Sequence, residues 1–348
     1  MRGHCSSADS RASPVRSSAV DESRRRAEMK PALSIVFFTV ASGAGLGLLA
    51  LLALADLCPV PLLAPAALPR GVALALVLIA AGLASSVLHL AKPSNAWRAF
   101  ARVRTSWLSR EAVLAALLFP LALVYLVAVS LDTAATVRTL LAIVVCLLAW
   151  GLLFCTAMIY ASLKPIRQWR TAWTPAAYLL LGHWSGALLA LVLAIGLGGE
   201  TVSWAWLAAA LGVAALIAKF GYWRHGAADR AGNSALTLEQ AIGVPQGVRP
   251  PGISVAQARL FDAGHTQRTF LTDEFVFRIA RRHAQALRGA ALALGFAVPL
   301  IWLATGPRHW AAALAIAAFA ILGLLVERWL FFADARHTVR LYHGDART

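Results

Sequence analysis

A histidine and two glutamates stand where long apolar runs of the sequence begin or end. His89 closes one apolar run, Glu111 opens the next, and Glu327, followed directly by Arg328, lies near the end of the last. An imidazole has a pKa near neutrality, and a nearby carboxylate can accept a proton or orient the ring. These residue types therefore suit the removal of protons from an organic molecule.

Oxidation of a quinol needs such groups, because two protons must leave as two electrons leave. We expect His89 to be the first base, with Glu327 or Glu111 taking the second proton or orienting the imidazole. The other residues expected to line the quinol pocket are Trp107, Arg110 and Arg328. Two structural alternatives remain open. Trp107 also fits the role of an interfacial belt residue, and Glu327 that of a partner for Arg328 or another arginine.

The composition places these residues in a membrane protein. Hydrophobic residues make up 59% of the chain and charged residues 14%, against about a quarter charged in soluble proteins. The apolar residues come in blocks of about twenty, the length that a helix needs to cross a hydrocarbon core of about 30 Å. Because backbone groups in lipid must be satisfied internally, we predict an all-α integral membrane bundle.

The apolar blocks predict eight transmembrane helices. Their approximate ranges are 33–57, 71–91, 111–131, 136–160, 174–198, 201–219, 284–305 and 309–331. Turn-forming stretches separate them, such as AKPSN after the second block and GLGGE after the fifth. No repeat of fixed period stands out along the sequence.

The basic residues predict the orientation, because cytoplasmic loops are enriched in Lys and Arg. Seven lie before the first span, five in the 92–110 loop, three in 161–173, nine in 219–283 and four from Arg328 onward, whereas the opposite loops hold Arg70, Arg138 and Arg308. Both termini are therefore expected in the cytoplasm. The net charge of +16 is mostly this signal and suits an anionic leaflet rather than nucleic acid.

The domain organisation follows from the same pattern. Residues 1–28 are rich in Ser and Arg and lack an apolar core, so we interpret them as a disordered extension or as the result of a start assigned upstream of Met29. Residues 29–348 are expected to form the eight-helix domain. A long cytoplasmic loop, residues 219–283, interrupts it.

No bound metal or haem is predicted for this protein. Cys5, Cys58, Cys146 and Cys155 show no C-x-x-C spacing, so neither an iron–sulfur cluster nor a zinc site is encoded. His89 and His183 fall at depths that differ by about 14 Å at 1.5 Å per residue, which does not suit shared haem ligation. His183 is instead expected to make a polar contact within the bundle.

Several stretches resemble the membrane-anchor subunit of dimethyl sulfoxide reductase (DmsC type), a quinol-linked anchor of molybdopterin oxidoreductases. They are LHLAKPSNAWRAF followed by SWLSRE, the WTP that enters the fifth span, and the glutamate with flanking arginine in the last. The likeness runs from about Met29 to the end. The family histidine implicated in quinol oxidation falls on His89, and Glu327 matches the glutamate of the last span.

The resemblance implies a subunit without haem, iron–sulfur cluster or molybdenum. Such a subunit sits in the bacterial inner membrane, oxidises menaquinol or another quinol, and passes the electrons to a ferredoxin-like iron–sulfur subunit and on to a molybdopterin catalytic subunit. We expect these partners to dock on the cytoplasmic face, over the 92–110 and 219–283 loops, with a basic surface meeting an acidic one. Two alternatives are a transporter without redox function and an anchor that serves only assembly.

Overall fold

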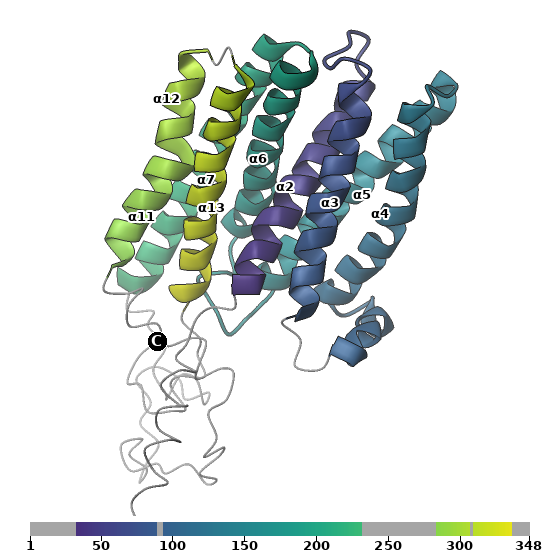
Figure 1. Cartoon of the computed structure of the whole chain (residues 1–348). Coiled ribbons are helices and arrows are strands. Elements are labelled where there is room, and N and C mark those ends of the chain that lie inside the picture. Colours follow the sequence, from purple (N-terminus) through teal and green to yellow (C-terminus); the bar gives the residue numbers. More distant parts are fainter. Residues whose placement is uncertain (1–32, 89–92, 232–282, 307–308, 336–348) are drawn as a thin grey trace, which may run out of the picture.

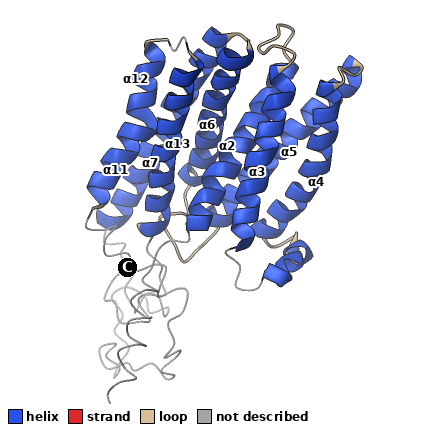
Figure 2. Cartoon of the chain, viewed as in Figure 1, coloured by secondary structure: helices blue, strands red, loops and turns tan. Residues whose placement is uncertain are grey.

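The apolar runs form helices because a backbone inside hydrocarbon must satisfy its own hydrogen bonds. A computed structural model describes residues 33–88, 93–231, 283–306 and 309–335. Within these ranges the chain consists of helices and the turns that join them (Figure 2), with an isolated antiparallel bridge between Leu63 and Gly199. The prediction of an all-α protein is confirmed.

Eight helices of the described chain are long and apolar enough to cross a membrane, as predicted. The first half forms α2 (Leu33–Asp56), α3 (Ala67–Leu88), the 3₁₀ helix η1 (Pro93–Arg102), α4 (Trp107–Ser130) and α5 (Ala135–Ala161). The second half forms α6 (Trp173–Leu197), α7 (Thr201–Ala231), α11 (Ala284–Leu292), the π-helix η3 (Ala293–Ala297), α12 (Val298–Ala304) and α13 (Trp310–Ala333). The segments α11, η3 and α12 follow one another directly and make one span.

The largest difference from the expected boundaries is in α7. The sequence predicts a span that ends at residue 219, whereas the helix continues to Ala231. The first residues of the expected 219–283 loop are therefore helical, and Lys219 lies inside the helix. The remaining expectations for residues 1–28 and for most of the long loop concern parts of the sequence outside the described residues.

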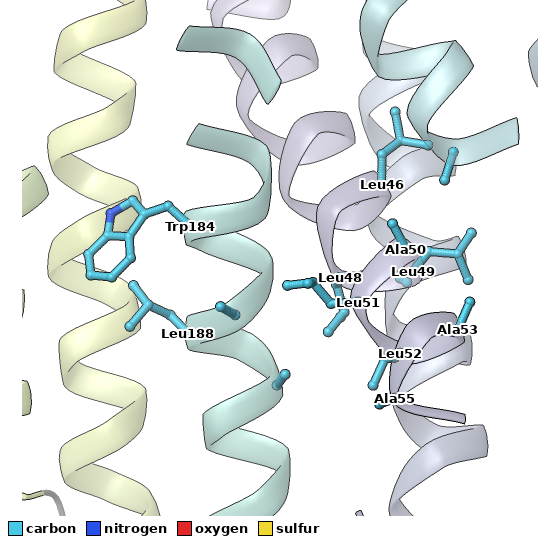
Figure 3. Packing of buried hydrophobic residues seen from close by; sticks show 14 of the residues in the cluster. Leu46, Leu48, Leu49, Ala50, Leu51, Leu52, Ala53, Ala55, Trp184 and Leu188 are labelled. Atoms are coloured by element: carbon cyan, nitrogen blue, oxygen red, sulfur yellow. The ribbon is translucent and has the colours of Figure 1, made fainter. Parts of the chain in front are cut away.

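Helix α2 lies at the centre of the bundle because it is apolar on all sides and rich in small residues. It packs against α3, α5, α6 and α13. At the α2–α6 crossing, a Cβ atom on Gly47 would collide with the carbonyl of Gly182, and one on Gly186 would collide with the backbone of Leu48. Figure 3 shows the apolar core around this crossing, with leucines of α2 on one side and Trp184 and Leu188 of α6 on the other.

The two halves of the bundle repeat one arrangement. In the first half, α3 and α5 both pack on α2. In the second half, α7 and α13 pack on α6 in the same way, so α6 corresponds to α2. The α4–α5 pair corresponds in the same way to the α11/α12–α13 pair. Each half contains an even number of spans, so the two halves run in the same direction through the membrane.

The start of α2 and the end of α13 lie at the same end of the bundle, together with η1 and the α5–α6 turn (Figure 1). We call this the basic end, since the predicted basic loops adjoin it. An ion pair fixes the opposite end. Arg138 of α5 donates from Nε to both carboxylate oxygens of Asp56 at 2.9 and 3.0 Å, and the Tyr125 hydroxyl of α4 donates to Asp56 at 3.0 Å. This contact joins three helices.

Candidate functional site

A buried ion cluster lies where α7 meets α13 near the basic end. Glu327 is 1% exposed, Arg328 4% and Lys219 0%. Lys219 Nζ pairs with one carboxylate oxygen of Glu327, and Arg328 Nε donates to the other at 2.5 Å. The alternative interpretation of Glu327 as the partner of Arg328 is thus observed, with Lys219 as a second cation. The three side chains together carry one excess positive charge.

Aromatic rings surround both cations of this cluster. The Cζ atom of Arg328 lies 4.4 Å from the ring centroid of Tyr178 and 4.7 Å from that of Phe331. Lys219 Nζ lies 4.3 Å from the ring centroid of Tyr222. Cation–π attraction is strongest when water is excluded. The rings therefore stabilise the excess charge that Glu327 does not neutralise.

The α5–α6 turn contributes a second aromatic layer. Trp169 stacks on Phe331 with 5.0 Å between centroids and donates from Nε1 to the Phe331 carbonyl at 3.1 Å. Tyr160 packs edge-on against both rings. Trp169 is 3% exposed. This layer fastens the turn to the end of α13.

Glu111, the other predicted carboxyl group, lies in the second turn of α4. The helix starts at Trp107, where the Ser106 hydroxyl caps it by accepting the Ser109 N–H at 3.4 Å. Glu111 is 5% exposed, and the Thr156 hydroxyl of α5 lies 2.5 Å from its Oε1. The same hydroxyl lies 3.1 Å from the Leu152 carbonyl, so its single proton has two available acceptors. Glu111 is thus a buried carboxyl group whose described polar partner is a hydroxyl.

Two tyrosines connect the surroundings of Glu111 with the ion cluster. Tyr160 of α5 and Tyr178 of α6 stack with 5.6 Å between centroids. Tyr160 lies one helical turn after Thr156, the partner of Glu111, and Tyr178 contacts Arg328. The predicted site residues Glu111, Glu327 and Arg328 therefore lie at one end of the bundle, and this tyrosine pair links the helices around them.

The structure gives Arg110 and Trp107 a positioning role at the start of α4. Arg110 donates to the carbonyls of Val103 and Arg104 at 2.9 and 2.8 Å, and its Cζ lies 4.2 Å from the Trp107 ring centroid. Trp107 packs edge-on against Phe154 of α5. These contacts hold the turn between η1 and α4. A contact of Arg110 or Trp107 with quinol stays a prediction.

His89 lies outside the described residues, and its expected role as a base stays a prediction. Helix α3 ends at Leu88, directly before it, at the basic end. His183 makes the expected polar contact between helices. Its Nε2 accepts from Trp150 Nε1 at 2.8 Å, and its Nδ1 lies 2.7 Å from the Leu179 carbonyl. Both ring nitrogens are engaged.

Within the described ranges, no group of three or more His, Cys, Asp or Glu side chains is placed to hold a metal ion. Cys58, Cys146 and Cys155 are free thiols. An apolar groove of about 460 Å³ lies at the basic end between α2, α11 and α13. Its walls include Phe37, Leu287 and Trp329. A volume of this size accommodates a hydrocarbon chain.

Sequence reasoning missed several residues of the site, above all Lys219, Thr156 and Tyr178. Lys219 carried a signal, since a charged residue in the apolar run LIAKFGYW is costly in a membrane and is a functional candidate by default. Because the predicted span ended at residue 219, Lys219 was interpreted as the first residue of a loop and not as a buried charge. Thr156 and Tyr178 carried no signal, because one polar group in an apolar helix does not reveal which neighbour it faces.

The geometry defines a class of protein: a polytopic helical membrane protein with a buried cluster of ionisable groups at its basic end. The sequence matches the family model of the DMSO reductase anchor subunit (DmsC) over residues 29–333, and the protein belongs to that family. It is therefore a multi-pass protein of the bacterial inner membrane and a membrane-anchor subunit of an oxidoreductase complex.

Two curated relatives support this assignment. The C subunit of sulfite dehydrogenase from Allochromatium vinosum is 33% identical over 336 residues, which covers 90% of this chain and 99% of that protein. The C subunit of anaerobic dimethyl sulfoxide reductase from Escherichia coli K12 is 31% identical over 118 residues, covering 34% of this chain and 41% of that protein. No solved structure has significant similarity to the protein. As an anchor subunit, the protein associates with catalytic and electron-transfer subunits in the membrane.

Proposed function

We propose that this protein oxidises menaquinol or a related quinol at its basic end and passes the electrons to a ferredoxin-like iron–sulfur subunit. The observation that carries the proposal is the presence of two buried carboxyl groups, Glu111 and Glu327, at one end of the bundle. Loss of two electrons converts the quinol to the quinone and releases two protons, so each hydroxyl needs an acceptor. His89, directly beyond α3, supplies the first base in this proposal.

Of the two carboxyl groups, Glu111 is the better proton acceptor. Both oxygens of Glu327 already face a cation, and protonation would break two ion pairs. Glu111 has a hydroxyl rather than a cation as its hydrogen-bond partner in the described part of the protein, and the Thr156 hydroxyl can rotate as the carboxyl group changes charge. We therefore assign Glu111 with His89 to proton removal, and Arg328 with Glu327 to the electrostatic surroundings of the site.

The iron–sulfur subunit is proposed to dock at the basic end, facing the cytoplasm, and to transfer electrons to or from a molybdopterin subunit. The described part of the 92–110 loop offers exposed side chains of the types that dominate protein interfaces: Trp97 is 65% exposed and Phe100 49%, beside Arg98 and Arg102. An acidic partner surface would complement these arginines. Electrons must pass over a short distance from the quinol site to the iron–sulfur cluster of the docked subunit. Both are therefore proposed to lie at the same end of the bundle.

The long match to a sulfite dehydrogenase subunit supports a second candidate direction. In that case oxidation of sulfite to sulfate by a catalytic subunit would release two electrons, and the anchor would use them with two protons to convert quinone to quinol. The same residues serve both directions, since a base for quinol is an acid for quinone by microscopic reversibility.

The test is purification of the tagged protein with its partners in mild detergent, followed by two assays. One measures oxidation of a menaquinol analogue with dimethyl sulfoxide as acceptor, and the other measures reduction of a quinone analogue with sulfite as donor. Activity in one assay identifies the direction. A complex that contains an iron–sulfur subunit but shows quinone chemistry with neither substrate, nor with an artificial electron carrier, contradicts the proposal and favours an assembly-only anchor.

A further inference from the structure

A small cavity lies beside the ion cluster, where α2, α6 and α13 meet. The space in which the centre of a water molecule fits has a volume of about 20 Å³, and one water needs about 10–15 Å³ by this measure. The polar residues that line it are Thr39, Tyr178, Ser185 and Arg328. The cavity is thus large enough for one water molecule and has polar walls.

The hydroxyl of Tyr178 carries the inference. Tyr178 is 4% exposed, and its hydroxyl makes no hydrogen bond to another group of the described chain. The Arg328 guanidinium is close to this tyrosine, with its Cζ atom 4.4 Å from the ring centroid, but it makes no hydrogen bond of normal geometry to the hydroxyl. Buried hydroxyl groups are normally hydrogen-bonded, since leaving one unpaired is unfavourable.

The two other hydroxyl groups of the cavity are acceptors. Thr39 donates its proton to the Val36 carbonyl at 3.0 Å, and Ser185 donates to the Leu181 carbonyl at 2.9 Å. A hydroxyl oxygen that has donated its proton keeps lone pairs that can accept. A molecule between these groups must therefore donate a hydrogen bond to Thr39 or Ser185 and form another with the Tyr178 hydroxyl. A water molecule can make both bonds.

We propose that this cavity is a site for one ordered water molecule, which hydrogen-bonds to the Tyr178 hydroxyl and links Arg328 to the hydroxyls of α2 and α6. The dipole of the water faces the excess positive charge of the ion cluster. The site is independent of the direction of electron transfer and of the identity of the quinol. It joins the cluster to the α2–α6 crossing at the centre of the bundle.

Gly43 allows a precise test because it lines the cavity and has space for a side chain. A Cβ atom added there would meet only the Cα of Gly182, at 4.0 Å. In a dry cavity, Gly43→Ala raises the melting temperature, since alanine favours helix and fills space. With a water present, the methyl group displaces it and leaves Tyr178 unpaired. We expect the melting temperature of the purified protein to fall by about 2–4 °C.

Two further variants separate this effect from a simple packing fault. Gly43→Ser places a hydroxyl in the same space and is expected to melt closer to the wild type than Gly43→Ala. In a Tyr178→Phe background, where no hydroxyl is left to satisfy, Gly43→Ala is expected to lose its destabilising effect. A rise in melting temperature with Gly43→Ala, equal in both backgrounds, overturns the proposal.

A direct readout covers the case in which the variants fail to fold. Electron cryomicroscopy of the wild-type complex, at a resolution that shows ordered water, is expected to reveal one density peak within hydrogen-bond distance of Tyr178 Oη. Continuous density from a lipid or detergent chain in the cavity, or the Tyr178 hydroxyl bonded directly to a protein group there, contradicts it.

Discussion

At the scale of single residues, the charge of the ion cluster decides which substitution is tolerated. Lys219, Glu327 and Arg328 carry one excess positive charge in an apolar interior. Removing Glu327 leaves two buried cations without a counter-ion, whereas removing Lys219 leaves the neutral pair of Glu327 and Arg328. Breaking a buried ion pair typically costs about 3–5 kcal/mol. The two substitutions should therefore differ strongly.

We predict that Glu327→Gln destabilises the protein by about 3–5 kcal/mol and that Lys219→Met has a smaller effect. The measurement is thermal or chemical unfolding of the purified variants in the same detergent. If both variants lose the same amount of stability, the excess positive charge is neutralised in another way, and the prediction is wrong.

Glu111 leads to a different prediction, because its described polar contact is with an uncharged hydroxyl. Glu111→Gln keeps the size of the side chain and its carbonyl oxygen, so assembly and stability should stay close to the wild type. If Glu111 accepts a quinol proton, the rate of quinol oxidation should fall roughly 10²-fold or more, as expected for loss of a general base.

The control for this experiment is Thr156→Val, which removes the hydroxyl beside Glu111 but keeps the carboxyl group. We expect a smaller loss of rate with this variant. Unchanged quinol oxidation by Glu111→Gln in an intact complex would show that the buried carboxyl group does not take part in the reaction.

These residue-level findings show how much of the site could be predicted. Glu111, Glu327 and Arg328 stand out in the sequence because ionisable residues in apolar runs are rare. The sequence alone does not indicate that Lys219 neutralises Glu327, since the two lie in different helices and far apart in the chain. Nor does it indicate that Arg110 bonds to backbone carbonyls of the preceding turn, because many arginines stand in that loop.

At the scale of the helices, lengths and positions of the spans follow from apolar composition, but their packing does not. The apolar runs place most span boundaries within a few residues of the observed ones; α7 is the exception, because its last turns are more polar. Which helices touch depends on small residues that let backbones approach. Gly47 and Gly186 at the α2–α6 crossing illustrate this.

We predict that Gly47→Ala strongly destabilises the bundle, because the added Cβ would collide with the Gly182 backbone, which cannot move without separating two central helices. Gly289→Ala in α11 is the matched control, since nothing lies within 4 Å of its added Cβ. The control should be neutral or slightly stabilising. Expression level and melting temperature of both variants measure the effect. A Gly47→Ala protein as stable as the control would contradict the close approach.

At the scale of the whole molecule, the repeated four-helix arrangement was not visible in the sequence. Apolar side chains exchange freely for one another in a lipid-facing helix, so the pattern of helix contacts can persist without a repeat of residues. The chemistry is not repeated: Glu111 and Glu327 lie at the basic end, whereas the Asp56–Arg138 pair braces the other. The two ends are thus distinct, and the orientation of the bundle decides which compartment the proposed site faces.

The predicted orientation can be tested with a native cysteine. Cys58 is exposed just beyond the end of α2, opposite the basic end, whereas Cys146 and Cys155 are buried. If the basic loops lie in the cytoplasm, a membrane-impermeant maleimide should label Cys58 in spheroplasts of a strain carrying Cys5→Ser. Ser162→Cys, introduced at the exposed end of α5, should be labelled only after the membrane is permeabilised.

The reverse labelling pattern would place Glu111 and the ion cluster near the periplasmic surface. The contacts within the site would be unchanged, since they do not depend on the compartment. The iron–sulfur partner would then have to dock from outside, and the protons of quinol oxidation would be released there. One labelling experiment therefore decides between two physiological outcomes of the same quinol reaction.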